Sequence, residues 1–155
     1  MTFQISALAR DRFTPLFPLS TDTLAARHIK RCVADQPRGF PCRVSLREAS
    51  VGERVLLLSY EHQPADSPYR ASGPIYVRED AVEATLAPND VPDILRTRIL
   101  SVRAYDDRHL MPASDVVDGT ALETVVERLF ADERVRYLHV HLAKAGCYAC
   151  RIDRA

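Results

Sequence analysis

The sequence predicts an α+β fold: a single domain built mostly from antiparallel strands, with two main helices. Three observations indicate this class. Strand-like apolar segments are joined mostly by short turns, two other segments show helical periodicity, and no internal repeat or long linker divides the chain. The 155 residues can bury a sizeable core without disulfide or metal staples. We therefore expect one domain over residues 1–155.

The two predicted helices cover residues 20–33 and 120–131. Ser20 can cap the first helix, and apolar residues recur along it at the spacing of one helical face. His28 and Cys32 belong to this stripe, so we expect them to pack against the core. The second helix has a more regular apolar stripe, which consists of Leu122, Val125, Val126, Leu129 and Phe130.

Strands are predicted in several other segments. Residues 54–60 are apolar on both faces, which is typical of a central strand covered on two sides. Residues 98–105 alternate and, after a turn, are expected to form a hairpin with residues 109–117. Shorter strands are expected near the N-terminus, at residues 42–46 and at residues 75–77.

A long loop is predicted at residues 61–74, with the sequence E-H-Q-P-A-D-S-P-Y-R-A-S-G-P. Its proline, glycine, serine and aspartate residues favour turns rather than regular structure. Loops of this length in compact domains are often functional. We therefore include it in the candidate site described below.

The chain ends in a predicted β-hairpin, residues 135–153. Gly146 suits the left-handed third position of a three-residue loop, Lys144 to Gly146, which pairs Ala143 with Cys147. Alternation then gives an apolar face with Leu138, Val140, Leu142, Tyr148, Cys150 and Ile152. The other face carries His139, His141, Ala143, Cys147, Ala149 and Arg151. A two- or four-residue loop would mix these sets, so we prefer the three-residue loop.

Composition excludes several classes of partner. Lysine plus arginine equals aspartate plus glutamate, at 21 each, so no net charge attracts nucleic acid or an acidic membrane. The longest apolar run, Val55 to Leu58, is far too short for a membrane span, and the N-terminus does not resemble a signal peptide. We expect a cytoplasmic protein whose four cysteines are reduced. It is expected to bind no nucleic acid and no membrane.

Three segments resemble a family of bacterial proteins. They are G-F-P-C-R-V-S-L at 39–46, Y-E-H-Q-P-A-D-S-P-Y-R-A-S-G-P-I-Y-V at 60–77 and H-V-H-L-A-K-A-G-C-Y-A-C-R at 139–151, and V-V-D-G at 116–119 extends the likeness over most of the chain. The family is the bacterial domain-of-unknown-function family 1203. The resemblance implies a single small cytoplasmic domain and carries no assigned activity, cofactor or catalytic residue.

His139 and His141 are candidate ligands of a transition metal such as zinc. They lie two residues apart on a predicted strand, so their rings project from the same face. A third ligand is required, and either Cys147 on that face or His62 from a neighbouring strand could supply it. The alternative is that both histidines lie on a polar sheet face and bind nothing.

The same face also offers candidate catalytic residues. A thiol beside an imidazole can act as a nucleophile, which points to Cys147 with His141, and His139 is the other imidazole in reach. The alternative is that Cys147 is an inert small residue after a turn. The C-x-x-C spacing of Cys147 and Cys150 is discounted, because residues three apart on a strand face opposite sides.

Arginines near the loop suggest a site for an anion. Arg43, Arg70 and Arg151 could hold a carboxylate or phosphate together with Tyr69 and Ser72, if the loop folds over the histidine face. The alternative is that Arg70 ties the loop to backbone carbonyls and that Arg151 pairs with a surface acid such as Asp153.

The leading hypothesis is therefore an uncharacterised soluble domain that binds a small, anionic molecule. Its pocket is expected between the 61–74 loop and the face formed by His139, His141, Cys147 and Arg151, with His62 nearby. Enzymatic activity is compatible with these residues but is not specified by them. The alternatives are a protein-interaction or homo-oligomeric module and a metal-binding protein that uses His139 and His141.

Overall fold

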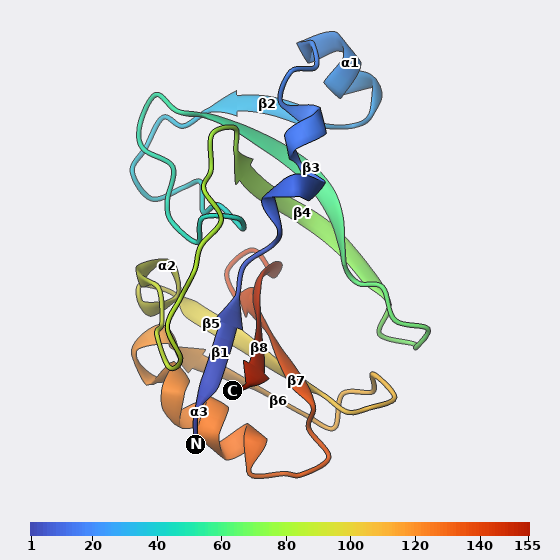
Figure 1. Ribbon diagram of the computed structural model, residues 1–155, viewed down its shortest axis with the longest axis vertical. Coiled ribbons are helices and arrows are strands. Elements are labelled where there is room, and N and C mark those ends of the chain that lie inside the picture. The colour runs from blue at the N-terminus through green and yellow to red at the C-terminus, as the bar shows by residue number, and fades with distance from the viewer.

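Two antiparallel sheets stacked one above the other form the body of the protein, as the computed structural model of residues 1–155 shows (Figure 1). The α+β class with mostly antiparallel strands is confirmed. The five-stranded sheet consists, in spatial order, of β1 (Phe3–Ser6), β8 (Cys147–Arg154), β7 (Tyr137–Leu142), β5 (Ile99–Tyr105) and β6 (Ala113–Asp118). The three-stranded sheet consists of β2 (Lys30–Val33), β3 (Arg54–Gln63) and β4 (Ala71–Arg78).

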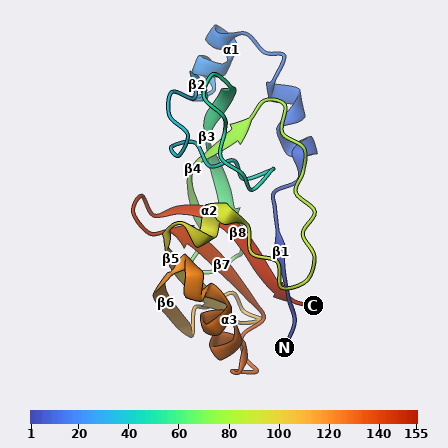
Figure 2. The same cartoon turned by 90° about the vertical axis from the view of Figure 1, so that its left-hand side faces the viewer.

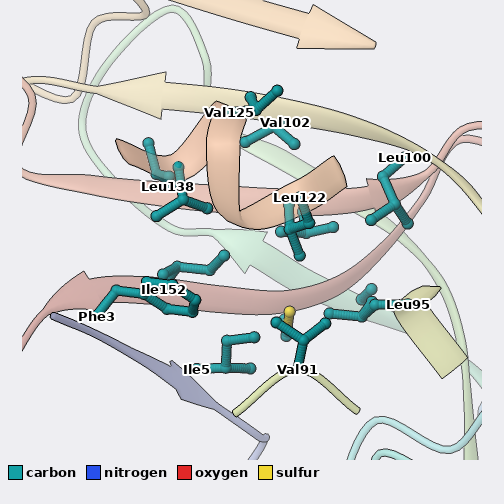
Figure 3. Close-up of a cluster of buried hydrophobic side chains, with 14 of the residues drawn as sticks. Phe3, Ile5, Val91, Leu95, Leu100, Val102, Leu122, Val125, Leu138 and Ile152 are labelled. Carbon is teal, nitrogen blue, oxygen red and sulfur yellow. The ribbon is translucent and has the colours of Figure 1, made fainter. Parts of the chain in front are cut away.

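The larger core lies on one face of the five-stranded sheet. Helix α3 (Leu122–Phe130) continues from a short 3₁₀ turn at Gly119–Ala121 and buries its apolar stripe on that face, which confirms the predicted second helix. Figure 3 shows Leu122 and Val125 of this helix beside Leu138 of β7 and Leu100 of β5. Full burial of each such side chain stabilises the fold by about 1.5–3 kcal/mol before entropy is counted.

The smaller core lies in the three-stranded sheet. The predicted central strand is confirmed, because β3 pairs with β2 on one side and with β4 on the other. Leu56 and Leu58 of β3 pack with Ile75 of β4, whereas Val55 points to a small cluster with Ala34 and Ala49. The prediction of a strand at residues 42–46 is wrong, since only single bridges form there, at Pro41 and Cys42.

All helices of the protein are short. The predicted helix 20–33 is wrong in extent: α1 covers only Thr21–Ala26, and β2 follows at residues 30–33. The chain leaves the helix through His28, whose φ of 57° lies in the left-handed region, and His28 is exposed. A further short helix, α2 (Asp93–Arg96), packs beside the 3₁₀ turn that precedes α3. No helix combines the length and apolar character needed to cross a membrane.

The predicted 61–74 loop is mostly a β-hairpin. Strands β3 and β4 continue to Gln63 and from Ala71, so the loop proper covers only residues 64–70. Within this hairpin Glu61 pairs with Ser72 and Gln63 with Ala71. His62 is therefore the extra residue of a β-bulge, a feature that bends a strand and redirects a side chain.

The terminal hairpin has a different register from the predicted one. Gly146 is left-handed as expected, with φ of 79°, but the loop has four residues and pairs Leu142 with Cys147. Tyr148 consequently lies opposite His141. Beyond it Cys150 pairs with Val140, so Ala149 is the extra residue of a second β-bulge. This bulge returns Arg151 to a position opposite His139, on the histidine face.

The two sheets meet on the face of the five-stranded sheet that α3 does not cover. Figure 2, turned by 90°, places α3 low on the molecule and the three-stranded sheet above, with β8 between them. The free end of the β3–β4 hairpin extends towards the β5–β6 hairpin in Figure 1, and the Ser67 hydroxyl donates a hydrogen bond of 3.1 Å to the carbonyl oxygen of His109. The hairpin thereby contacts the turn between β5 and β6.

Candidate metal centre

Three histidines come together where the two sheets meet. His139 and His141 project from β7, and His62 projects from the bulge in β3. One ring nitrogen of each histidine lies within 4.8 Å of the corresponding nitrogens of the other two. The prediction that His139 and His141 share a face is confirmed, and His62 joins them from the neighbouring sheet.

Strand alternation and the β3 bulge together explain this placement. In β7 the apolar residues Leu138 and Val140 enter the main core, so the histidines on either side of Val140 must face the other way. The next residue after His62 anchors the bulge: the Gln63 amide nitrogen donates a hydrogen bond of 2.9 Å to the Tyr137 hydroxyl. The hairpin is thus held against β7 at the site.

The histidine rings are buried but incompletely hydrogen-bonded. His139 is 3% exposed and His141 is 1% exposed, while His62 is half-buried and gives the cluster its contact with solvent. Each ring has one buried nitrogen without a partner: Nδ1 of His62, Nδ1 of His139 and Nε2 of His141. Such orphaned nitrogens cost about 1–3 kcal/mol each, so three together call for an explanation.

The tautomer of His141 is set by the backbone. Its Nδ1 lies 2.9 Å from the carbonyl oxygen of Gly146, and a carbonyl oxygen only accepts hydrogen bonds. Nδ1 therefore carries the proton, and the lone pair is on the orphaned Nε2. A backbone carbonyl holding the outer ring nitrogen is the arrangement that orients metal-binding histidines.

All three imidazoles are held in their neutral form. Burial, with smaller contributions from the neighbouring His141 and His62, lowers the pKa of His139 to about 3. Burial likewise lowers the pKa of His141 to about 4, against the raising effect of its bond to Gly146. The pKa of His62 is also lowered, first by burial and then by Arg103. Neutral imidazole is the form that binds metals.

Aromatic rings frame the cluster. Tyr148 stacks on His62, with centroids 5.3 Å apart and planes at 2°, and meets His139 edge-on at 5.1 Å. Tyr105 and Tyr137 pack on the other side of His139, at 5.1 and 5.2 Å. These contacts limit rotation of the imidazoles and shield them from water.

The donor set suits a transition metal of the zinc type. Zinc binds imidazole nitrogen at about 2.0–2.1 Å, which requires nitrogens roughly 3.4 Å apart in a tetrahedral site. One nitrogen of each ring already lies within 4.8 Å of the other two, which is close to this spacing. Three histidine ligands leave the fourth tetrahedral position for an added ligand, as in catalytic rather than purely structural zinc sites.

Cys147 does not lie on the histidine face, contrary to the prediction. It pairs with Leu142 and packs against the main core, on the same side of the sheet as the buried Cys150. The predicted separation of the two cysteines is therefore wrong, because the four-residue loop and the bulge at Ala149 each shift the register. Cys150 itself is in the core as expected.

Arg43 is also outside the cluster. Its guanidinium group is only 1% exposed and donates hydrogen bonds to the carbonyl oxygens of Tyr148, at 2.7 Å, and Pro41, and to Sγ of Cys147 at 3.1 Å. These bonds join the 41–43 segment to β8, so Arg43 ties the two sheets together. Burial lowers its pKa.

The remaining predicted residues lie at the edge of the site. Arg70 is exposed and pairs with Glu61 at 2.8 Å, and Ser72 is exposed on β4. Tyr69 contacts Tyr105 edge-on at 6.0 Å, which places it at the outer rim. The predicted convergence of Arg43 and Arg70 with Arg151 is therefore not seen.

Arg151 does lie on the histidine face, but its charge is already neutralised. It forms a bidentate pair with Asp153, at 2.7–3.0 Å, and its guanidinium group sits 4.0 Å from the centroid of the Tyr137 ring. The predicted alternative, pairing with Asp153, is confirmed. Arg151 therefore supports the aromatic frame.

Besides Tyr105 and Tyr137 of the aromatic frame, two further residues at the site were not predicted. Arg103 lies opposite His139 on β5, and Tyr148 was assigned to the apolar face. The alternation of Ser101, Arg103 and Tyr105 with apolar residues was a readable signal for Arg103. No sequence signal marks the bulge that turns Tyr148 towards the histidines.

A broad hollow of about 1040 Å³ opens elsewhere on the molecule. It is lined by residues near Ser45, Arg78, Val91 and Thr97, and by none of the three histidines. The histidine cluster is therefore separate from this hollow.

Comparison with known proteins gives a family but no activity. A family model described as "Protein of unknown function (DUF1203)" matches residues 39–154. This range contains all three histidines and their aromatic frame. No curated protein and no solved structure matches the chain.

Proposed function

Since this chain belongs to the DUF1203 family, whose description assigns no activity, we propose a function from the site itself: the protein binds a transition metal ion of the zinc type. The observation that carries the proposal is the set of three neutral histidines, two buried and one half-buried, each with an orphaned ring nitrogen. Chance placement of polar residues would leave such nitrogens hydrogen-bonded or exposed.

His62, His139 and His141 would hold the ion. Neutral histidines need lose no proton to bind, so the lowered pKa values of His139 and His141 favour uptake at neutral pH. The Gly146 carbonyl oxygen orients His141, and stacking on Tyr148 orients His62. These contacts preorganise two of the three ligands before the ion arrives.

A metal held by three histidines acts as a Lewis acid towards a molecule bound at its open position. The protein's own part is to keep the three imidazoles neutral, to fix their orientation and to exclude bulk water. This arrangement favours chemistry on a small ligand over a purely structural role. We also propose a location in the reducing cytoplasm, supported by the four free thiols.

Elemental analysis and zinc titration of untagged, chelator-treated protein test the proposal. Reconstituted wild-type protein is expected to hold about one equivalent of zinc, since one cluster of three ligands binds one ion. His62→Phe keeps the ring that stacks on Tyr148 and removes the ligand. It should weaken binding by more than about 100-fold, which exceeds the usual cost of losing a supporting residue.

His28→Asn is the matched control, because His28 is exposed in a left-handed turn that asparagine tolerates. Its zinc binding should equal that of the wild type. Equal zinc binding by wild-type protein and His62→Phe would show that the ion, if bound, is held elsewhere. No binding by the wild type would refute the proposal outright.

A further inference from the structure

Arg103 is the residue that the metal proposal leaves unexplained. It lies on β5 directly opposite His139, on the face that carries the histidines. Directly opposed residues in antiparallel strands have Cβ atoms about 4.5–5.5 Å apart, within reach of each other's side chains. On the other side of His139, the opposed residue is Arg151. One row of the sheet therefore carries two arginines with a candidate metal ligand between them.

The two arginines differ in their partners. Arg151 is neutralised by Asp153, as described above. No acidic side chain forms an ion pair with Arg103. Arg103 is half-buried. A partly buried cation without a counterion is uncommon, because it loses hydration without gaining a partner charge.

The strand register places Arg103 beside the histidine cluster. Along the pairing of β5 with β7, Ser101 lies opposite His141 and Arg103 lies opposite His139. Arg103 is therefore the charged residue of β5 that borders the two histidines of β7. A metal cation there would leave two positive charges together, unless an anion joined them.

We propose that Arg103 recognises a small oxyanion, a carboxylate or phosphate group, that binds at the open position of the three-histidine metal site. The inference rests on the proposed metal function and adds the class of ligand. Guanidinium offers paired N–H donors that match two oxygens of such a group. A second lone pair of a carboxylate oxygen, or a further oxygen of a phosphate group, then remains free to bind the metal. The anion supplies the counter-charge that both cations lack.

The aromatic frame limits the size of this anion. Tyr105 and Tyr137 pack on one side of His139 and Tyr148 on the other. Of the three histidines, only His62 is partly exposed to solvent. These walls favour an anion of a few heavy atoms or the exposed acidic end of a longer molecule. Arg103 therefore takes the role that the sequence suggested for Arg43 and Arg70.

Cobalt-substituted protein gives a direct readout, because its visible absorption changes when a ligand joins a tetrahedral Co²⁺ ion. Inorganic phosphate and acetate are the probes, and acetamide is the uncharged match for acetate. Wild-type protein should bind both anions and discriminate against acetamide. Arg103→Gln should keep its metal and weaken anion binding by about 10- to 100-fold, the usual effect of losing a charge-assisted hydrogen-bonded pair.

Arg103→Lys keeps the charge but loses the paired donors, and should give an intermediate affinity. Arg128→Gln is the control for net charge, because Arg128 lies on α3 behind the opposite face of the sheet. Its anion affinity should match that of the wild type. The relative affinities for phosphate and acetate show which oxyanion the site prefers.

Metal content measured in the same samples separates the two proposals. If wild-type protein holds cobalt but binds the anions as tightly as Arg103→Gln does, the inference is wrong and the metal site stands. Equal binding of acetate and acetamide, or no anion binding to the cobalt form, also overturns it. If the wild type holds no metal, the proposed function fails first.

Discussion

The two faces of the five-stranded sheet differ in the side chains that they bury: one is apolar, and the other carries histidines and tyrosines. On the α3 face, β7 contributes Leu138, Val140 and Leu142 to a core of 21 buried residues. On the other face the same strand contributes Tyr137, His139 and His141 to a framework of rings with unsatisfied nitrogens. Six consecutive residues, all buried, therefore serve two different purposes.

The difference teaches that burial alone does not identify a core. The apolar face is stabilised by removing hydrocarbon from water, whereas the histidine face loses the hydration of its imidazoles without full replacement. The first face carries the stability that allows the second to hold three neutral histidines in place. Substitutions on the two faces should consequently separate stability from ligand binding.

The largest expected effect comes from the metal. At a free zinc concentration 1,000 times the dissociation constant, binding to the folded state alone adds about 4 kcal/mol to the free energy of unfolding. Thermal or urea unfolding with and without zinc measures it. At the same zinc concentration, His62→Phe should gain no more than about 1.4 kcal/mol, because its affinity is at least 100-fold weaker, and it should unfold cooperatively without metal. A zinc effect of the same size in that variant would assign the stabilisation to other ligands.

On the apolar face, Leu138→Ala should cost about 3 kcal/mol of stability, because it opens a cavity beside α3 at a fully buried position. Urea unfolding of the metal-free protein provides the measurement. The folded variant should still take up about one equivalent of zinc, since Leu138 points away from the histidines. Loss of zinc binding in folded Leu138→Ala would show that the two faces are coupled.

Acid should destabilise the metal-free protein through the histidine face. The folded pKa values of His139 and His141 lie at about 3 and about 4, below the ordinary histidine pKa of 6.5, so the unfolded chain binds more protons between these pH values. Their contribution is complete above pH 6.5 and is lost progressively as the pH falls towards 4 and 3.

We expect a loss on the order of 2 kcal/mol per histidine between pH 6.5 and 4.5. Urea unfolding at both values measures it. Carboxylates elsewhere also titrate in this range, so the comparison is with His139→Gln, which should show a shallower pH dependence. Parallel pH profiles of variant and wild type would contradict the depressed histidine pKa.

The smallest effect is expected at Cys147. Cys147→Ala should leave zinc stoichiometry and affinity within about twofold of the wild type, well under the 10-fold that 1.4 kcal/mol represents, because the residue faces the main core. The same zinc titration measures it. A large loss of zinc affinity would revive the register in which Cys147 joins the histidines.

The histidine pair of β7 was predictable because it depends only on alternation. Apolar residues at every second position of 138–142 determine which face is buried in the core, and the histidines must take the other. The same reasoning identified the second main helix and the central strand of the small sheet. These features are local, and a single strong pattern specifies each of them.

The rest of the site depends on two β-bulges and on the length of one loop, which the pattern of apolar and polar residues does not predict. His62 was named as a candidate third ligand, but only the bulge in β3 turns it towards β7. Gly146 correctly marked a left-handed turn residue, yet one extra loop residue reversed the face of Cys147. A second bulge at Ala149 then restored Arg151. Arg151 follows both the longer loop and the bulge, so the two shifts cancel and it keeps its predicted face. Cys147 precedes the bulge and is affected by the loop shift alone.

The origin of the three ligands has a mechanical consequence. His62 belongs to the upper sheet and its two partners belong to the lower one, and no strand pairs across the boundary. An ion bound to all three would cross-link the two sheets, in addition to the hydrogen bond from Gln63 to Tyr137. We expect backbone amides at the end of the β3–β4 hairpin to exchange hydrogen faster when the ion is removed. Binding of the metal ion would then reduce the motion of the three-stranded sheet relative to the five-stranded sheet.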